Sequence, residues 1–411
     1  MGAADDVRDE VRTWLAEHWD PERPLADWRQ IVVDSGWACP TWPVQWYGKG
    51  LSPVLAGVVT EEFDRVGAVG AAGGSGLTLA APTILAHGSD LLKRTLLRRI
   101  ATGEDTWCQL FSEPGNGSDL AGLSTRADRD GDEWVVSGQK VWNTGAHKAA
   151  WGMLLARTDW DVPKHRGITY FAVPMRQPGV EVRPLVQMNR YQSFNEVFLT
   201  EARVADEHRI GDVGQGWAAA MTTLAHERGL QAIRLSRVPD GLGRCAREAA
   251  EEAVEYAKTY VWYPQRAGRS DLLIPRARAT GAASDPLARQ AITSILALEK
   301  AARWNVERGK AARAAGRPPG PEGSLGKLSA SMISKRSAAA HAAMTGADAM
   351  LTGPDSPEAG IIAEIIVSSP AVSIAGGTDE IQHDILGERM LGLPKEPSVD
   401  KDIAFRDVRR N

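Results

Sequence analysis

Cysteine is scarce in this chain, and the three that occur, Cys39, Cys108 and Cys245, stand far apart. They form no Cys-x-x-Cys pair and no spacing typical of metal ligands, so the sequence predicts neither a disulfide framework nor a metal site. Isolated thiols suit a reducing compartment. We therefore expect the protein to be cytoplasmic.

A basic excess and a long apolar run are also missing. The formal net charge is −4 and the sequence pI is near 6.1, so we expect no nucleic-acid partner. No window approaches the apolar length that crosses a bilayer. The first residues, "MGAADDVRDEVRTWLAEHW", are acidic where a signal peptide is basic and apolar, and we expect no membrane association.

The composition that remains is that of a globular protein. The chain has 411 residues, of which 43% are hydrophobic and 24% charged, and this excludes disorder over most of its length. Such a length allows two or three domains with buried cores. No fixed period in the sequence indicates internal repeats.

The pattern of the sequence changes twice along the chain. Up to about residue 105 it is helical, and the first helix places Val7, Val11, Trp14 and Leu15 at apolar positions. Residues 106–205 carry strand signals: a hairpin around Asp130 and Gly131, then "GITYFAVPM" and "FNEVFLTEARV". Ala-rich helical stretches follow at 217–260, 286–315 and 325–352. We predict an α+β protein with domains at 1–105, 106–205 and 206–411.

Four ordered stretches carry a resemblance to a known family. They are "SEPGNGSD" at Ser112 to Asp119, "SGQKVWNTGAHKAAW", "IGDVGQGWAAAMTTLAHERG" and "SIAGGTDEIQHDILGERMLGLP". In this order the chain resembles the acyl-CoA dehydrogenases over nearly its full length. The resemblance implies an N-terminal helical domain, a central β-barrel-like domain and a C-terminal four-helix bundle. It also implies FAD as cofactor, an acyl-CoA substrate and an electron-transfer flavoprotein or similar acceptor.

The chemistry of several motif residues suits a flavin. Ser112 and Thr144 can offer hydroxyls to the edge of the ring, and Trp142 can pack against it. Taken singly, each could equally be an ordinary core or strand residue. The resemblance assigns cofactor contacts to Gln109, Leu110, Ser112, Gly117, Ser118, Trp142, Thr144, Gly377, Thr378 and Glu380. The resemblance also implies that Ser118 faces the thioester side of the ligand. Glu380 has a second interpretation, as an acidic residue favoured at a helix start.

The base that takes the substrate's α-proton is not where many family members have it, because the residue before Gly377 and Thr378 is Gly376. Some members carry this glutamate on the first helix of the C-terminal bundle, which corresponds here to Glu227. Glu227 could instead be a surface residue paired with Arg228. We predict Glu227 as the base, because dehydrogenation needs a carboxylate across from the flavin. Arg228 and Gly376 are then predicted on the substrate side.

Two departures from the family pattern concern assembly. Typical homotetrameric members have Arg-x-x-Phe-Gly and Gln-x-x-Gly-Gly-x-Gly motifs that reach a neighbour's FAD, but this chain has "YVWYPQRAGRSDL" and "MTGADAMLTGPDS" there. In this it resembles subunits of actinobacterial heterotetrameric acyl-CoA dehydrogenases, which act on bulky thioesters. The alternative is a homomer in which the arginines of "RAGRSDLLIPRAR" replace the lost motifs. We expect an oligomer, a dimer or tetramer, and a bulky or branched acyl group such as a steroid side chain.

Two other functions stay open at this level. A family member with this site could carry out different flavin chemistry, such as monooxygenation, and Glu227 would then be dispensable. The chain could also be a non-catalytic partner subunit of a heteromeric dehydrogenase. It would then hold no flavin with any partner.

Overall fold

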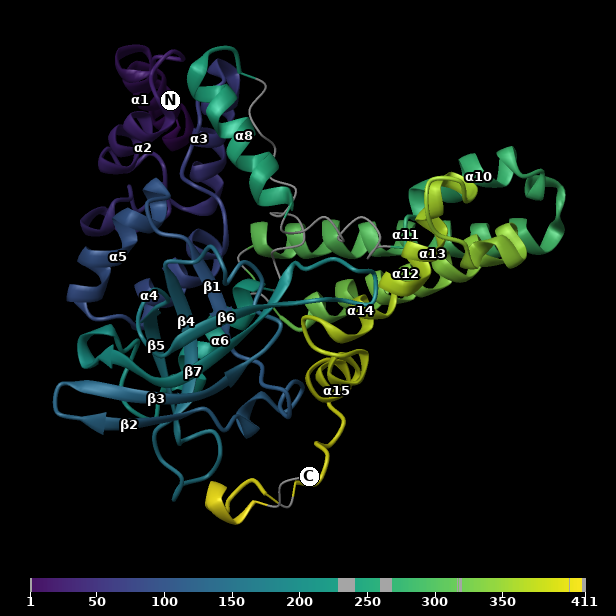
Figure 1. Ribbon diagram of the computed structural model, residues 1–411. Helices are drawn as coiled ribbons and strands as arrows, with labels where there is room; N and C mark the ends of the chain where they lie inside the picture. Colours follow the sequence, from purple (N-terminus) through teal and green to yellow (C-terminus); the bar gives the residue numbers. More distant parts are fainter. Residues whose placement is uncertain are drawn as a thin grey trace. The chain divides into compact units, whose positions relative to one another are not determined.

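The computed structural model describes residues 2–227, 241–258, 268–315, 317, 320–398 and 400–408. It divides into two compact units, each described by itself (Figure 1). The first comprises Met1–Leu185, Ser193–Thr259 and Val399–Asn411, and the second Val186–Gln192 and Tyr260–Ser398. The last residues of the chain thus belong with the first unit.

The first unit begins with helices, as the sequence predicts. They are α1 (Ala3–His18), α2 (Leu25–Asp34), α3 (Pro53–Val66), α4 (Ala81–His87) and α5 (Asp90–Thr102). The helical spacing of Val7, Val11 and Leu15 buries all three, which confirms the predicted apolar face of the first helix. Ser52 begins α3 by accepting a hydrogen bond from the Leu55 amide, and Gly67 ends it with a φ of 70°.

A seven-stranded sheet follows, in the region where the sequence predicts strands. Its strands are β1 (Trp107–Leu110), β2 (Arg126–Asp130), β3 (Glu133–Lys140), β4 (Trp151–Arg157), β5 (Ile168–Pro174), β6 (Val180–Leu185) and β7 (Phe194–Ala205). The order is β1-β4-β2-β3-β7-β6, with β5 paired to β4. The predicted hairpin turn is one residue off: Asp130 pairs with Glu133, so Gly131 and Asp132 form the turn. Gly131 has a φ of 62°, which favours glycine there.

Helices and sheet share one hydrophobic core. Strands β4 and β5 are buried along nearly their whole length, and side chains such as Met153 and Tyr170 pack with Ile84 of α4 and Leu97 of α5. Continuous burial of this kind is expected for strands covered on both faces. The core therefore fixes β1 and β4 against the helices. Strand β1 leads directly into residues 112–119, called the Ser112 motif below.

Helix α6 (Gly216–Glu227) is anchored on the same core. A side chain at Gly216 would lie 2.6 Å from the Thr169 carbonyl carbon, so only glycine allows the helix to start this close to β5. The buried Thr223 hydroxyl lies 3.1 Å from the Tyr170 hydroxyl and 2.8 Å from that of Thr83. These contacts fix the helix one turn before Glu227. Helix α8 (Arg244–Lys258) packs with the N-terminal helices through Cys245 and Ala249.

The second unit is helical. Its helices are α10 (Leu273–Ala279), α11 (Pro286–Ala314), α12 (Glu322–Thr345), α13 (Ile361–Ser368), α14 (Pro370–Ile374) and α15 (Asp379–Arg389). Helices α11 and α12 lie side by side (Figure 1). Small buried residues of α12, among them Ser331, Ser334 and Ala338, allow neighbouring helices to approach closely. Together with the first unit this is a helical domain, a curled β-sheet domain and a helical domain in sequence, the predicted fold.

One described segment, Glu358–Arg389, has the length and apolar composition of a membrane-spanning helix, which corrects the expectation that no window approaches that length. The structure divides it into α13, α14 and α15, with Gly376 and Gly377 at φ values of 70° and 88° in the second break. Ile362 and Ile365 are buried with Ala338 of α12. The apolar composition therefore serves packing within the second unit.

Candidate active site

The Ser112 motif is held by a buried ion pair. Lys140, fully buried at the end of β3, donates from Nζ to Glu113 Oε1 at 2.9 Å and to the Phe111 carbonyl at 3.0 Å. Glu113 also accepts from the amides of Ser124 and Thr125 at 2.6 and 2.8 Å. Burial alone would raise the pKa of Glu113, but the Lys140 charge and these donors outweigh it and hold that pKa below its usual value. Sequence reasoning missed both residues, although each lies inside a quoted motif.

The loop after β3 presents an exposed tryptophan. Trp142 has a φ of 64°, rare for a bulky residue, and is 55% exposed, with its edge-to-face neighbour Phe194 at a centroid distance of 5.6 Å. The Val141 amide donates to the Ser112 carbonyl at 2.9 Å, so this loop and the Ser112 motif lie together. The local backbone strain is offset by the buried Asn143, whose Nδ2 donates to the Gln109 carbonyl at 2.7 Å.

Gln109 connects this loop to Glu227. Its carbonyl accepts from Asn143, and its Nε2 donates to Glu227 Oε2 at 3.4 Å. Glu227 is the half-buried last residue of α6, and Leu110, next to Gln109, is fully buried. The structure thus brings together three segments that lie far apart in the sequence: Gln109 with Ser112, Trp142 with Thr144, and Glu227. Predicted contact residue Arg228 lies outside the described residues.

The residues around this loop fit a flavin. A Cβ placed on Gly115 or Gly117 meets no described atom within 4 Å, so the backbone there is open to a close approach. Asn143 Oδ1 is buried without a partner among the described residues. Within the same residues no hydrogen bond uses the hydroxyls of Ser112, Ser118 or Thr144. An exposed flat ring, hydroxyls that can donate and an amide oxygen that can accept are the kinds of group that hold a flavin.

The other predicted residues lie in the second unit. Thr378 caps α15 by accepting from the Ile381 amide at 3.3 Å, while Gln382 Nε2 donates to the carbonyls of Gly376 and Gly377 at 3.1 and 3.4 Å. Glu380 is exposed in the first turn of α15, and a hydrogen bond from its own backbone amide, with a second from the Thr378 hydroxyl, lowers its pKa. This is the position that its helix-start interpretation predicts. A contact of Glu380 with a cofactor stays a prediction.

Asp379 is a structural residue of this motif that sequence reasoning missed. Its carboxylate accepts from Lys327 Nζ at 2.9 Å, Lys335 Nζ at 2.9 Å and Ser331 Oγ at 2.7 Å. Burial opposes ionisation, but these three donors hold the pKa of Asp379 well below its usual value. The pair of lysines on α12 thereby fixes the start of α15 and the glycines before it.

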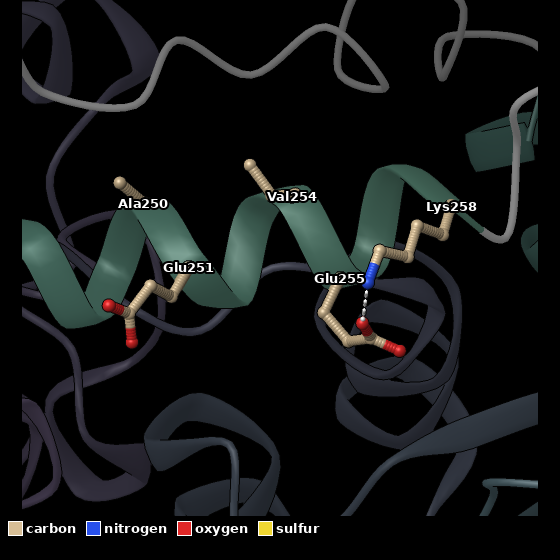
Figure 2. A pocket seen from close by; sticks show the side chains of 5 residues that line it. All are labelled: Ala250, Glu251, Val254, Glu255 and Lys258. Carbon is tan, nitrogen blue, oxygen red and sulfur yellow. Dashed lines mark hydrogen bonds and ion pairs between the residues drawn. The ribbon is translucent and has the colours of Figure 1, made fainter.

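A hollow of about 550 Å³ lies elsewhere in the first unit, on α8 (Figure 2). It is lined by Ala250, Glu251, Val254, Glu255 and Lys258, and Glu255 and Lys258 form an ion pair there. None of the predicted site residues lines it. The exposed Glu251 on this face provides a useful reference carboxylate for experiments on Glu227.

The cysteines are buried in the described part of the chain, away from solvent. All three cysteines are buried and free, and burial raises the pKa of Cys39 and Cys108 to about 12. Their thiols are therefore protonated at neutral pH. Among the described residues no group of three or more His, Cys, Asp or Glu side chains could hold a metal ion.

Comparison with known proteins identifies the family of this fold. Residues 3–104, 108–201 and 214–391 match the N-terminal, middle and C-terminal domains of the acyl-CoA dehydrogenases. The acyl-CoA dehydrogenase IpdE1 of Mycobacterium tuberculosis (strain ATCC 25618 / H37Rv) is 34% identical over 421 residues, which cover 96% of this chain and 99% of that protein.

Solved structures agree with the fold. The structure titled Tcur3481-Tcur3483 steroid ACAD G363A variant has a TM-score of 0.65 at 24% identity, covering 96% of this chain and 99% of that one. The ChsE4-ChsE5 complex from Mycobacterium tuberculosis gives 0.62 at 25%, with the same coverage. At 24% identity, the similarity to the steroid ACAD variant is evidence for the fold alone.

Fold and matches together define an oxidoreductase. The chain belongs to the acyl-CoA dehydrogenase family, since all three family domains are present in order and a relative is similar over its full length. Members of this family are typically FAD-dependent.

Proposed function

We propose that this chain catalyses the FAD-dependent α,β-dehydrogenation of an acyl-CoA thioester, with Glu227 as the base. The observation that carries the proposal is the double contact of Gln109, whose side chain reaches Glu227 at 3.4 Å while its carbonyl holds Asn143 at 2.7 Å. One residue thus links the predicted base to the loop of Trp142 and Thr144. When bound, FAD would take the β-hydrogen of the substrate as hydride.

The chain's own residues would hold the reactants and move the proton. Glu227 breaks the α-carbon–hydrogen bond by accepting the proton, and the electron pair left behind forms the new double bond as hydride leaves the β-carbon. Gln109 donates to one oxygen of the Glu227 carboxylate and would thereby help to hold that side chain in place. Ser112 and Thr144 offer hydroxyls, Trp142 offers a flat apolar face, and the Gly117–Ser118 backbone offers space for the thioester side.

Further cofactor and substrate contacts are part of the proposal. We propose that Gly377, Thr378 and Glu380 face the cofactor, with Gly376 and Arg228 near the substrate. A Cβ at Gly376 meets no described atom within 4 Å, so space is left where many relatives have a glutamate. This space supports a bulky or branched acyl group, such as a steroid side chain. The proposed domain bounds, 1–105, 106–205 and 206–411, enclose the three matched ranges.

The proposed partner and location rest on the arginines of the second unit and on the cysteines. Arg269 forms a bidentate pair with Asp271, and the buried Arg276 is held by Glu358, His341 and Thr345, so both side chains already have partners within this chain. Arg278 is exposed, and Arg266 lies outside the described residues. This favours an unlike partner chain over a homomer with a rebuilt arginine loop. An electron-transfer flavoprotein is the proposed acceptor, and the free thiols support the cytoplasm as location.

The test is the absorption spectrum of the purified protein before and after a panel of acyl-CoA thioesters. We expect a flavin spectrum that bleaches with a thioester, and a Glu227→Gln variant that keeps flavin and thioester binding but reduces at least ~10²–10⁴-fold more slowly. The matched control is Glu251→Gln, the same change on the exposed face of α8, which should reduce normally.

The outcomes separate the alternatives. Normal reduction of Glu227→Gln would remove Glu227 as base and favour other flavin chemistry, such as monooxygenation. A chain that holds no flavin, alone or with a related subunit, would be a non-catalytic partner.

A further inference from the structure

The last described residues of the chain, residues 400–408, dock on the loop between β4 and β5 at residues 158–167. The Phe405 amide donates to the Val162 carbonyl at 3.0 Å, and the Arg406 amide donates to the Trp160 carbonyl at 3.0 Å. The Arg406 guanidinium also pairs with Asp161. Two successive main-chain bonds and a charge pair indicate a specific docking, since an uncommitted terminus would leave these amides to water.

One connection from this segment reaches the Ser112 motif through Arg157. The Phe405 ring is 3% exposed, and the guanidinium carbon of Arg157 lies 3.4 Å from its centroid. Arg157 is fully buried and donates to the carbonyls of Ala121 at 2.7 Å and Leu123 at 3.1 Å. These carbonyls belong to the turn that directly follows residues 112–119. Phe405 therefore closes the pocket of the cation that fixes this turn.

A second connection passes through Lys164. Its Nζ lies 2.7 Å from Asp400 Oδ2 and 3.1 and 3.0 Å from the two carboxylate oxygens of Asp119. Asp119 is the last residue of the Ser112 motif, and its side chain lies against Gly122, where an added Cβ would be 2.9 Å from Oδ2. Lys164 is largely buried, with 13% of its side chain exposed, so two carboxylates share one desolvated cation. Asp400 helps to hold Lys164 where it can bind Asp119.

We propose that residues 400–408 form a strap that positions residues 112–119 for the flavin and the thioester, with Lys164 and Phe405 as positioning residues. This rests on the proposed function of residues 112–119. The strap belongs to the far end of the sequence, yet both of its connections end on the same loop. A loop of small and polar residues has little core of its own to define it, so its geometry depends on such outside contacts.

The test compares two charge-matched variants in the full-length chain. Asp400→Asn and Asp402→Asn each remove one negative charge two positions apart, but only Asp400 contacts Lys164, and Asp402 is exposed. Phe405→Ala tests the second connection. Amide hydrogen exchange is measured without ligand in residues 158–167 and 112–123, together with the thermal midpoint and kcat and KM for an acyl-CoA thioester.

We expect Asp400→Asn and Phe405→Ala to speed exchange in both segments and to raise KM about tenfold, with kcat within about twofold. Asp402→Asn should change neither. The strap would be refuted if residues 158–167 open while residues 112–123 keep their protection, or if Asp402→Asn gives the same changes. Hydrogen exchange does not depend on turnover. A chain that fails to reduce flavin would contradict the proposed function, and the exchange result would still test the strap.

Discussion

At the scale of single residues, the site depends on one buried ion pair. Lys140 is fully buried and Glu113 is 8% exposed, and between them they join the Ser112 motif to the end of β3. Removing one partner leaves the other charge buried without compensation, which is far more destabilising than breaking a surface pair. The pair thus holds the two motifs proposed to contact the flavin ring, although neither residue need touch a ligand.

Lys140→Met should lower the free energy of unfolding by about 3–5 kcal/mol, because Glu113 would remain in a desolvated site. Urea denaturation measures the change. The control is Lys148→Met, which removes the same cation from the exposed pair with Glu255 and should alter stability by no more than about 1 kcal/mol. Equal, small changes in both variants would contradict the role given to Lys140.

At the scale of elements, the buried carboxylate of Glu62 ties α1 to α3. Glu62 of α3 is 1% exposed and accepts from Arg8 at 2.6 Å, Arg12 at 2.8 Å and Arg65 at 2.7 Å. The hydrogen bond from Arg12 is the largest cause that lowers the pKa of Glu62 to about 2, with Arg65 and Arg8 adding to it and burial opposing. The N-terminal helices therefore share a stabilising charge cluster.

This cluster predicts a pH dependence. Because the folded pKa of Glu62 is lowered, its stabilisation is fully present above its unfolded pKa, near 4.5, and is lost as pH falls toward 2. Glu62→Gln should reduce the free energy of unfolding at pH 7 by about 1–3 kcal/mol, discounted because the arginines are partly exposed. The difference from the unaltered chain should shrink below pH 4.5.

Denaturant titrations at several pH values measure this difference. Glu61→Gln is the control, since Glu61 is exposed and pairs only with Arg8 among these arginines. A difference that stays constant down to pH 3 would contradict the assignment of the pKa shift to Glu62.

At the scale of the whole molecule, assembly depends on how the chain compensates for the two missing family motifs. Of the four arginines proposed to replace them, Arg269 and Arg276 are engaged within the second unit, Arg278 is exposed, and Arg266 lies outside the described residues. A flavin whose phosphates lack donors should be held weakly. Expressed alone, the chain should therefore contain less than one flavin per chain, and a related subunit carrying the motifs should raise that content.

The measurement combines flavin content and mass in solution with turnover of a steroid-type thioester and of butyryl-CoA. We expect the bulky thioester to be preferred, because Gly376 leaves open space where a larger side chain would stand. A fully loaded homotetramer that prefers butyryl-CoA would overturn both expectations.

The sequence by itself determined the structural features that depend on short-range residue patterns. The apolar spacing of Val7, Val11 and Leu15 records a helix face, and the alternation around Gly131 records a hairpin to within one residue. These signals are local because backbone periodicity repeats within a few residues. The ordered motifs likewise identified the family and its three-part fold.

Only the tertiary structure decided which residues act together. Nothing in the sequence distinguishes Lys164 from other lysines, and the motif around Lys140 does not reveal its burial, because burial and partner are set by chain segments that meet in space. Gln109 meets Glu227 across 118 positions, and Lys164 meets Asp400 across 236. Packing also gives two adjacent carboxylates different environments: Asp379 is enclosed by two lysines, while Glu380 is exposed. Long-range packing, which assigns each charge its desolvation and its partner, is the physical reason.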